Sequence, residues 1–285
     1  MVFYPEKWLS YVDRFVEAYE YGRQLLGHAG KEVPAVSGSL DLLCPDAGTL
    51  LLCSPHPDDE LLTGALALRL MKEKRCRVIN LAFSLGSDPN SKSRRFAELQ
   101  DACSVVDFEW RLAKQPLGFD NIRPQAQEDH AEWQAMVEMI VAHFQEIAPD
   151  ILVMPHAGDG HPSHQGVNLL ACEALKLYSQ QREKHLVVAE TGFWHPQADP
   201  KLMVSLDPVD LALLLSGLEK HAEEMARNPY ALQMPARMMA SSGRGRELLQ
   251  GLGEGKGGAL FAELYGLAVY DKGERQQWSG KSIVV

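Results

Sequence analysis

The sequence predicts an α/β protein in which helices cover both faces of a mostly parallel sheet, a three-layer Rossmann-like sandwich. Two observations lead to this fold class. Short apolar runs of strand length alternate along the chain with longer segments whose apolar residues recur at helical spacing. In addition, two of these runs, Leu50–Cys53 and Ile151–Pro155, stop at polar turns that contain histidines. Functional groups of open α/β sheets collect at the carboxyl ends of strands, so we expect the chemistry at these two turns.

The individual elements follow from the same patterns. An N-terminal helix is expected over Pro5–Leu26 and is interpreted as an extension that lies on the domain. Residues 1–48 are predicted to form this helical extension with a connecting loop, and residues 49–285 to form one domain. Further strands are predicted at 77–84, 107–112, 185–191 and 201–206, and helices at 92–105, 131–147, 165–180 and 208–226.

Three stretches show no clear pattern but hold residues of interest. The irregular connection 113–129 is long enough to border a pocket. The loop 192–200 places Trp194 beside His195, which suits either stacking on a sugar ring or a packed corner. Residues 229–258 are rich in Met, Arg and Gly, and their arginines either bind an anionic substrate group or belong to a solvated loop. These arginines are Arg237, Arg244 and Arg246.

Composition excludes several classes of function. Of the 285 residues, 46% are hydrophobic, enough for the core of one large domain, and the net charge of -10 leaves no basic excess for nucleic acid. No run of about 18 apolar residues occurs, so no transmembrane segment is predicted, and the first 30 residues lack the apolar centre of a signal peptide. The five cysteines are scattered and odd in number, as expected of a cytoplasmic protein.

The first polar turn, His56 to Glu60, has residue types suited to metal-dependent hydrolysis. His56 and Asp59 stand three positions apart and can turn toward one cation such as zinc. Asp58 lies between them and is the candidate general base that takes a proton from water. The ordinary alternative is an acidic helix N-terminus with a surface histidine.

The second polar turn, His156 to His164, strengthens the metal hypothesis. With His56 and Asp59, His164 would complete a three-ligand site that leaves a fourth position for water, the pattern of a catalytic zinc site. His161 then remains free as an acid or as the group that stabilises an oxyanion. Iron or cobalt suits the same ligands, because preference among divalent metals also follows availability.

Both turns resemble the signature motifs of one family. The segments SPHPDDE, at 54–60, and GDGHPSH, at 158–164, are similar to the Ala-His-Pro-Asp-Asp-Glu and His-Pro-Asp-His turns of the zinc-dependent deacetylases of the PIG-L or LmbE-like family. The resemblance extends over about residues 50–265. Other similar segments lie at 95–99, 117–120 and 261–265.

The resemblance implies a role for most residues of the site. Zinc would be held by His56, Asp59 and His164. Asp58 would be the general base, and His161 the acid or the oxyanion-stabilising histidine. The substrate-contacting residues that we predict are Arg95, which stands where the family has a substrate-binding arginine, Asp120 and Asp159.

One departure from the family pattern concerns Ser163, which stands where the family has Asp in its second turn. The change removes a carboxylate from beside the histidines of the site. Asp159, four residues earlier, is the candidate that would supply a replacement charge.

The residues and the resemblance together predict a metal-dependent amidohydrolase with one zinc ion per chain. It would remove an acetyl or other acyl group from an N-acetylglucosamine-type amino sugar or its conjugate, with or without a phosphate or nucleotide. Two alternatives stay open. One is a sugar-binding or regulatory protein that keeps the metal turn but has lost turnover, which Ser163 motivates. The other is an amidase that acts on a thiol conjugate of glucosamine.

Overall fold

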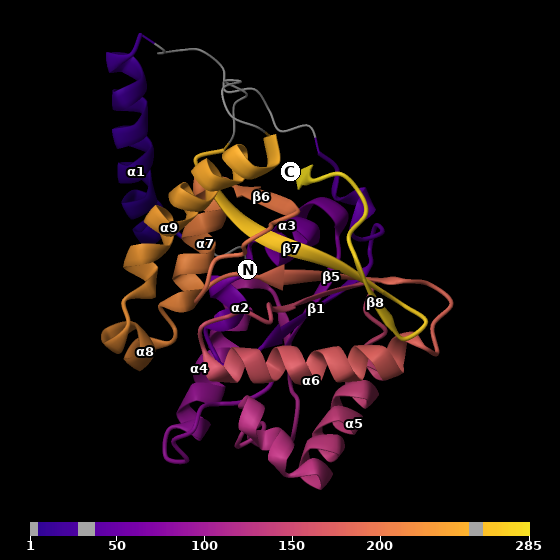
Figure 1. Cartoon of the computed structure of the whole chain (residues 1–285). Coiled ribbons are helices and arrows are strands. Elements are labelled where there is room, and N and C mark those ends of the chain that lie inside the picture. Colours follow the sequence, from indigo (N-terminus) through magenta and orange to yellow (C-terminus); the bar gives the residue numbers. More distant parts are fainter. Residues whose placement is uncertain (1–4, 28–37, 251–258) are drawn as a thin grey trace.

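The computed structural model describes residues 5–27, 38–250 and 259–285. Their centre is one nine-stranded sheet, and helices cover both of its faces, which confirms the predicted three-layer α/β sandwich (Figure 1). The strand order is β3 (Glu109–Leu112), β2 (Arg77–Ala82), β1 (Thr49–Ser54), β4 (Ile151–Pro155), β5 (Leu186–Thr191), β7 (Phe261–Asp271), β6 (Leu202–Leu206) and β9 (Ile283–Val284), with β8 (Glu274–Gln277) paired to β7. The sheet is parallel from β3 to β5, whereas β7 runs antiparallel to β5 and β6.

The strand order reverses between β1 and β4. The chain leaves β1 toward β2 and β3 on one side, and it later continues through β4 and β5 on the other side. Parallel strands that diverge in this way leave a crevice at their carboxyl ends, where α/β proteins bind their ligands. Both histidine-containing turns follow these two strands, so the topology brings the turns together.

Alternate residues of the central strands face opposite layers. In β1, Leu50 and Leu52 belong to one apolar core, while Leu51 and Cys53 belong to the other. Because both faces are buried, the sequence of β1 is a nearly continuous run of apolar residues.

The helices are α1 (Glu6–Leu25), α2 (Asp59–Leu62), α3 (Ala65–Lys74), α4 (Lys92–Val106), α5 (His130–Ile147), α6 (Pro162–Ser179), α7 (Pro208–Leu218), α8 (Ala222–Arg227) and α9 (Tyr230–Gly245), with short 3-10 turns at Leu40–Leu42 and Pro124–Glu128 and a π turn at Arg246–Gln250.

The N-terminal helix α1 packs against α7. Val12 is fully buried, and Trp8 Nε1 donates a hydrogen bond to Glu219 Oε2 over 2.9 Å. The helix therefore lies on the sheet domain. No helix among the described residues is long and apolar enough to cross a bilayer.

The helix predicted over 208–226 is interrupted. It ends at Leu218, and the short helix α8 follows after a turn. The reason is His221 in that turn, which is buried and lies 3.1 Å from a carboxylate oxygen of Glu60. This tertiary contact outweighs the helical pattern of the surrounding sequence.

The Met- and Arg-rich region after Pro229 is a helix over most of its described length. α9 buries Met234 and Met238 in the apolar core. The solvated-loop interpretation is therefore wrong over 230–245, because the methionines occupy one face of a helix that the core covers. Residues 251–258 of this region lie outside the described part of the chain.

A buried tyrosine and a partly buried glutamate of β7 fix the first turn of α3. The Tyr265 hydroxyl donates to Glu263 Oε2 over 2.6 Å and accepts the backbone N–H of Leu66 over 3.0 Å. Glu263 also accepts the backbone N–H of Ala65 over 3.2 Å. The first N–H groups of a helix have no acceptor within the helix. Side chains of β7 therefore supply the acceptors for the start of α3, the helix that follows the first polar turn.

We expect Tyr265→Phe to lower the free energy of unfolding by about 1–3 kcal/mol, because Glu263 and the N–H of Leu66 would lose a buried partner. Tyr270→Phe is the matched control. Tyr270 lies on the same strand and is fully buried, but among the described residues its hydroxyl meets only the weakly hydrogen-bonding thiol of Cys172 and no helix start. Urea unfolding of both variants measures the difference, and equal losses would contradict the capping role of Tyr265.

Candidate metal site and active site

The two polar turns meet at one cavity of about 350 Å³. It opens beside the carboxyl ends of β1 and β4, which are neighbouring strands. A larger groove of about 960 Å³ runs along β8 and β9, but its described walls bring no group of metal-ligating side chains together. The smaller cavity is therefore the candidate site. Of the predicted site residues, it is lined by His56, Asp58, Asp59, Arg95, Asp120 and His161.

Backbone strain marks the first turn. Asp58 has a φ of 116°, which a residue with a Cβ rarely adopts and which costs about 1–3 kcal/mol. Two carboxylates hold the turn in this shape. Glu60 Oε2 accepts the N–H of Asp58 over 3.0 Å, and Asp59 Oδ2 accepts the N–H of His56 over 2.9 Å. The bend brings His56, Asp58 and Asp59 to the same cavity.

Four side chains of types that can bind a metal come together at this point. Ring nitrogens of His56, His161 and His164 lie within 4.8 Å of one another. Asp59 Oδ2 is 3.5 Å from His56 Nδ1 and 3.4 Å from His164 Nε2. Two ligands that share a tetrahedral zinc ion are about 3.3–3.4 Å apart, so these distances fit a shared cation. His164 Nε2 is also buried without a hydrogen-bond partner among the described residues, which suits a ligand atom.

Asp159 lies behind His164 rather than at the cavity. Its side chain is fully buried, which leaves it no access to a substrate. Oδ1 accepts the backbone N–H of His161 over 2.9 Å, and Oδ2 lies 3.4 Å from His164 Nδ1. From this position a carboxylate orients a ligating imidazole. Asp159 thus stands where it can replace the charge that Ser163 lacks.

The buried charges of the cluster shift the pKa values of their neighbours. Burial opposes the charged form of His164, but the carboxylates of Asp59 and Asp159 raise the pKa of His164 to about 10. Burial acts to raise the pKa of Asp59, yet His164 and His56 hold that pKa well below its ordinary value. For Asp58, burial and then the charge of Asp59 raise the pKa. Asp58 is therefore a stronger proton acceptor than the charged carboxylate beside it.

His161 presents a hydrogen-bond donor to the cavity. Its Nδ1 accepts the backbone N–H of Ser163 over 3.3 Å, so the ring hydrogen of the neutral form is on Nε2. Burial lowers the pKa of His161, and the neighbouring His56 and His164 lower it further. The neutral donor form is therefore favoured, which suits an oxyanion-stabilising role better than that of an acid.

Both Arg95 and Asp120 line the cavity, but their surroundings differ. Arg95 is nearly buried and donates hydrogen bonds to the carbonyl oxygens of Pro57, over 3.1 Å, and Leu85, over 3.3 Å. Asp120 is exposed at the rim and forms an ion pair with the buried Lys92, which lowers the pKa of Asp120. Arg95 is thus a fixed part of the wall, whereas Asp120 faces solvent.

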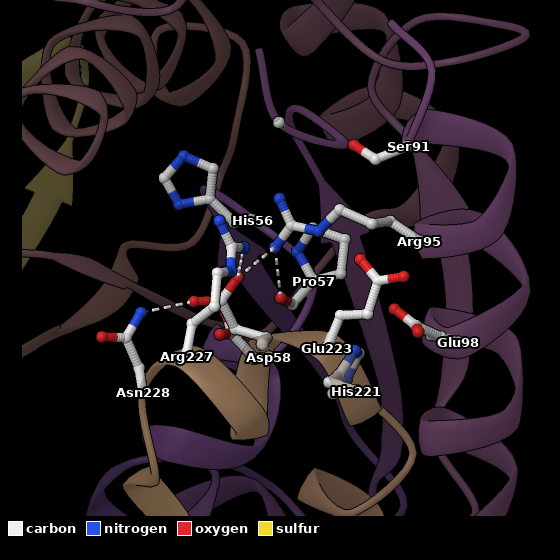
Figure 2. A network of polar contacts seen from close by, with 12 residues as sticks. His56, Pro57, Asp58, Ser91, Arg95, Glu98, His221, Glu223, Arg227 and Asn228 are labelled. Atoms are coloured by element: carbon white, nitrogen blue, oxygen red, sulfur yellow. Dashed lines mark hydrogen bonds and ion pairs between the residues drawn. The ribbon is translucent and has the colours of Figure 1, made fainter. Parts of the chain in front are cut away.

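Sequence reasoning missed one wall of the cavity, which α8 and the start of α9 provide. Glu224, Asn228 and Tyr230 all line it. Figure 2 shows Asn228 and other side chains of this segment beside Asp58. No motif marks these residues. The only local signal was the Asn-Pro dipeptide at 228–229, which indicates a turn.

An aromatic ring and the irregular connection complete the wall. Trp194 is partly exposed at the cavity, and its ring centroid lies 5.4 Å from that of Tyr230. The connection 113–129 lines the cavity through residues that include Asn121 and Arg123, which confirms that it borders the pocket. The cavity therefore combines charged and aromatic surfaces.

Residues 51–175 match the family model described as PIG-L: GlcNAc-PI de-N-acetylase. The matched segment contains both polar turns, and it confirms the resemblance noted in the sequence. A comparison with curated protein sequences returned no match.

Several solved structures share the fold. A conserved protein from Thermus thermophilus is 20% identical, with a TM-score of 0.57 over 76% of this chain and 92% of that one. The 4-carboxy-2-hydroxymuconate hydratase GalB from Pseudomonas putida is 15% identical, with a TM-score of 0.54 over 77% and 95%. The N,N'-diacetylchitobiose deacetylase from Pyrococcus horikoshii is 15% identical, with a TM-score of 0.51 over 78% and 84%. At these identities the likeness shows a common fold.

We expect the apparent affinity for zinc to rise about tenfold per pH unit between pH 6 and pH 8. The pKa of His164 in the metal-free protein is raised to about 10, so at these pH values its imidazole carries a proton that must leave before Nε2 can bind the metal. Competition titrations against a chelator at several pH values measure this dependence. An affinity that does not change with pH would contradict the assignment of His164.

We also expect Asp159→Asn to weaken zinc binding by about 10–100-fold, because it removes the carboxylate that orients His164. Asp120→Asn is the control. It removes a carboxylate from the rim of the same cavity and should leave the affinity unchanged. Equal losses in the two variants would show that general charge, rather than contact with His164, is responsible.

Proposed function

We propose that this chain, whose residues 51–175 match the PIG-L family model, is a metal-dependent hydrolase that removes an acetyl or other acyl group from an N-acetylglucosamine-type amino sugar or its conjugate. One observation carries the proposal. His56 and Asp59 line one cavity together with a second carboxylate, Asp58, and Nε2 of the buried His164 lies 3.4 Å from Asp59 Oδ2. Hydrolytic zinc sites combine a set of metal-binding side chains with a nearby carboxylate that does not bind the metal and can accept a proton. A deacetylase of a chitobiose derivative also shares the fold.

The proposed metal is zinc, held by His56, Asp59 and His164. Iron(II) or cobalt(II) suits the same nitrogen and oxygen donors. When bound, the metal polarises the amide carbonyl and lowers the pKa of water beside it. Asp159 supports the His164 ring from behind, which directs Nε2 of that ring toward the cluster.

Asp58 is the proposed general base. It is buried, it lines the cavity, and it is next in sequence to the proposed ligand Asp59. Because burial and the charge of Asp59 raise its pKa, Asp58 accepts a proton from the attacking water more readily than an ordinary carboxylate does. The same proton then passes to the departing amine.

His161 and the cavity walls are proposed to orient the substrate. The Nε2–H of neutral His161 donates to the amide oxygen as negative charge develops there. Arg95 and Asp120 bind sugar hydroxyls, and the exposed part of Trp194 packs on the ring. A cavity of about 350 Å³ is at the small end of ligand sites, which suits one sugar ring and leaves an aglycone outside.

A second candidate function is binding or regulation without turnover, and the observation behind it is Ser163. Asp159 argues against it, because its Oδ2, 3.4 Å from His164 Nδ1, still supplies a charge beside that histidine. An amidase that acts on a glucosamine thiol conjugate would use the same cluster. The substrate of such an amidase would differ only in the group that lies outside the cavity.

We expect Asp58→Asn to keep its metal but to lose about 10²–10⁴-fold in kcat for acetate release, because Asn retains the shape of the side chain and cannot take a proton. The assay uses free, nucleotide-linked, lipid-linked and thiol-conjugated N-acetylglucosamine compounds, with metal content measured in parallel. Asp120→Asn should instead act mainly on KM. Unchanged kcat in Asp58→Asn would refute its role as the base.

We expect Ser163→Asp to leave kcat within about threefold of the wild-type value, because Asp159 already supplies the charge beside His164. In an Asp159→Asn background, the same Ser163→Asp substitution should restore part of the lost activity. Acetate release and zinc affinity of the single and double variants measure both effects. A sharp rise in activity from Ser163→Asp alone would favour the second candidate function.

A further inference from the structure

Two consecutive glutamates of α8 face two consecutive arginines of α4. Away from the cavity, Glu223 Oε2 is 2.5 Å from Arg94 Nη2, with the two side chains 66% and 35% exposed. At the cavity wall, Glu224 Oε2 is 3.9 Å from Arg95 Nη2, with the two side chains only 13% and 12% exposed. The short helix α8 has no fully buried residue, and these charge pairs, together with Met225 packed against the core, hold it beside the site.

Glu224 occupies the position of an anion between two guanidinium groups. Its Oε2 accepts a hydrogen bond from Arg227 and faces Arg95, while its Oε1 accepts Asn228 Nδ2 over 2.7 Å. Figure 2 shows Arg95, Arg227 and Asn228 directed toward one point beside Asp58. Guanidinium groups and an amide donor are the usual partners of a phosphate or carboxylate group. In this chain, the carboxylate of Glu224 occupies the position that such an anion would take.

Arg95 cannot turn away to meet another anion. Its Nη2 donates to the carbonyl oxygen of Pro57 over 3.1 Å, and its Nη1 donates to that of Leu85 over 3.3 Å. The backbone of Gly86 approaches so closely that an added Cβ would collide with Nη1. The guanidinium group is therefore held in place, with Glu224 as its charged partner.

The negative charge of Glu224 acts on other residues that line the cavity. After burial and the charge of Asp58, the charge of Glu224 contributes to raising the pKa of Tyr230. A phosphate that entered beside α8 would meet this negative charge and find both arginines already paired. A neutral hydroxyl would instead find carboxylate lone pairs that can accept a hydrogen bond.

We propose that Glu224 determines the charge class of the substrate. It occupies the anion site of Arg95 and Arg227, so the cavity accepts a sugar ring with neutral hydroxyl groups and rejects one that is phosphorylated where the ring meets α8. This inference rests on the proposed function and narrows it, since the sequence left open a phosphate-bearing sugar. A conjugate that carries a phosphate must hold it outside the cavity. Removal of the carboxylate turns the same wall into a phosphate site.

The test measures binding of sugars that contain no amide to the zinc-loaded protein. The ligands are methyl glucoside, glucose 1-phosphate and glucose 6-phosphate, each followed by NMR titration. Wild type should bind methyl glucoside at least about tenfold more tightly than either phosphate, and Glu224→Gln should bind one of the phosphates about tenfold more tightly than wild type does. Thermal unfolding establishes that the variant is folded.

Two control variants test whether sugar selectivity depends on a negative charge at the cavity wall or on the loss of any negative charge from α8. Glu223→Gln removes the same charge one residue away, outside the cavity, and should bind all three ligands as wild type does. Glu224→Asp keeps the charge and should keep the preference for the neutral sugar, even where its affinity is lower. A folded Glu224→Gln with unchanged selectivity overturns the proposal.

The wild-type protein alone also tests the inference. Tighter binding of either phosphate than of methyl glucoside, or binding of none of the three sugars, overturns it. Failure of the proposed function has a different signature, because no N-acetylglucosamine compound would then release acetate while the sugar selectivity persists. Acetate release without charge selectivity would overturn only the role of Glu224.

Discussion

The buried carboxylate of Glu60 is the group on which the rest of the site depends. Its Oε2 accepts the N–H of Asp58, and its Oε1 lies 3.1 Å from Nε2 of the buried His221. Without such a partner, the strained backbone of Asp58 would also leave a buried N–H unpaired. The same carboxylate therefore holds the turn that carries the proposed ligands and ties it to the segment that leads into α8. One side chain thus connects the proposed metal ligands with the wall of the cavity that α8 provides.

Local sequence patterns were sufficient to predict which two polar turns meet at the cavity. The pairs His56 with Asp59 and His161 with His164 each stand three positions apart, shortly after an apolar run. Their residue types alone indicate metal-dependent hydrolysis. The sequence did not indicate that the strand order reverses between the two runs. The general behaviour of parallel sheets nevertheless predicted that their carboxyl ends would meet, and the fold confirms it.

The substrate side could not be predicted to the same degree, because contacts between distant residues place it. The helical pattern of 208–226 continues through His221, and only the contact with Glu60 turns the chain inward there. Asp159 has the residue type of a substrate contact, yet its hydrogen bond from the His161 backbone and its burial hold it behind the cluster. Burial and tertiary partners decide such cases, and neither is visible as a spacing in the sequence.

The position of Trp194 and of Glu224 along the chain has a consequence for how this fold diversifies. Both lie beyond residue 175, whereas the cluster and its base lie within the segment that the family model matches. Neither side chain belongs to the proposed ligands or moves a proton in the proposed reaction. A change at either position leaves the proposed ligands and the proposed base in place, so the walls of the cavity can be altered separately from the cluster. For protein engineering, the loop at 192–200 and the segment at 222–230, which leaves the buried contact of His221 with Glu60 intact, are the parts to exchange between homologous scaffolds.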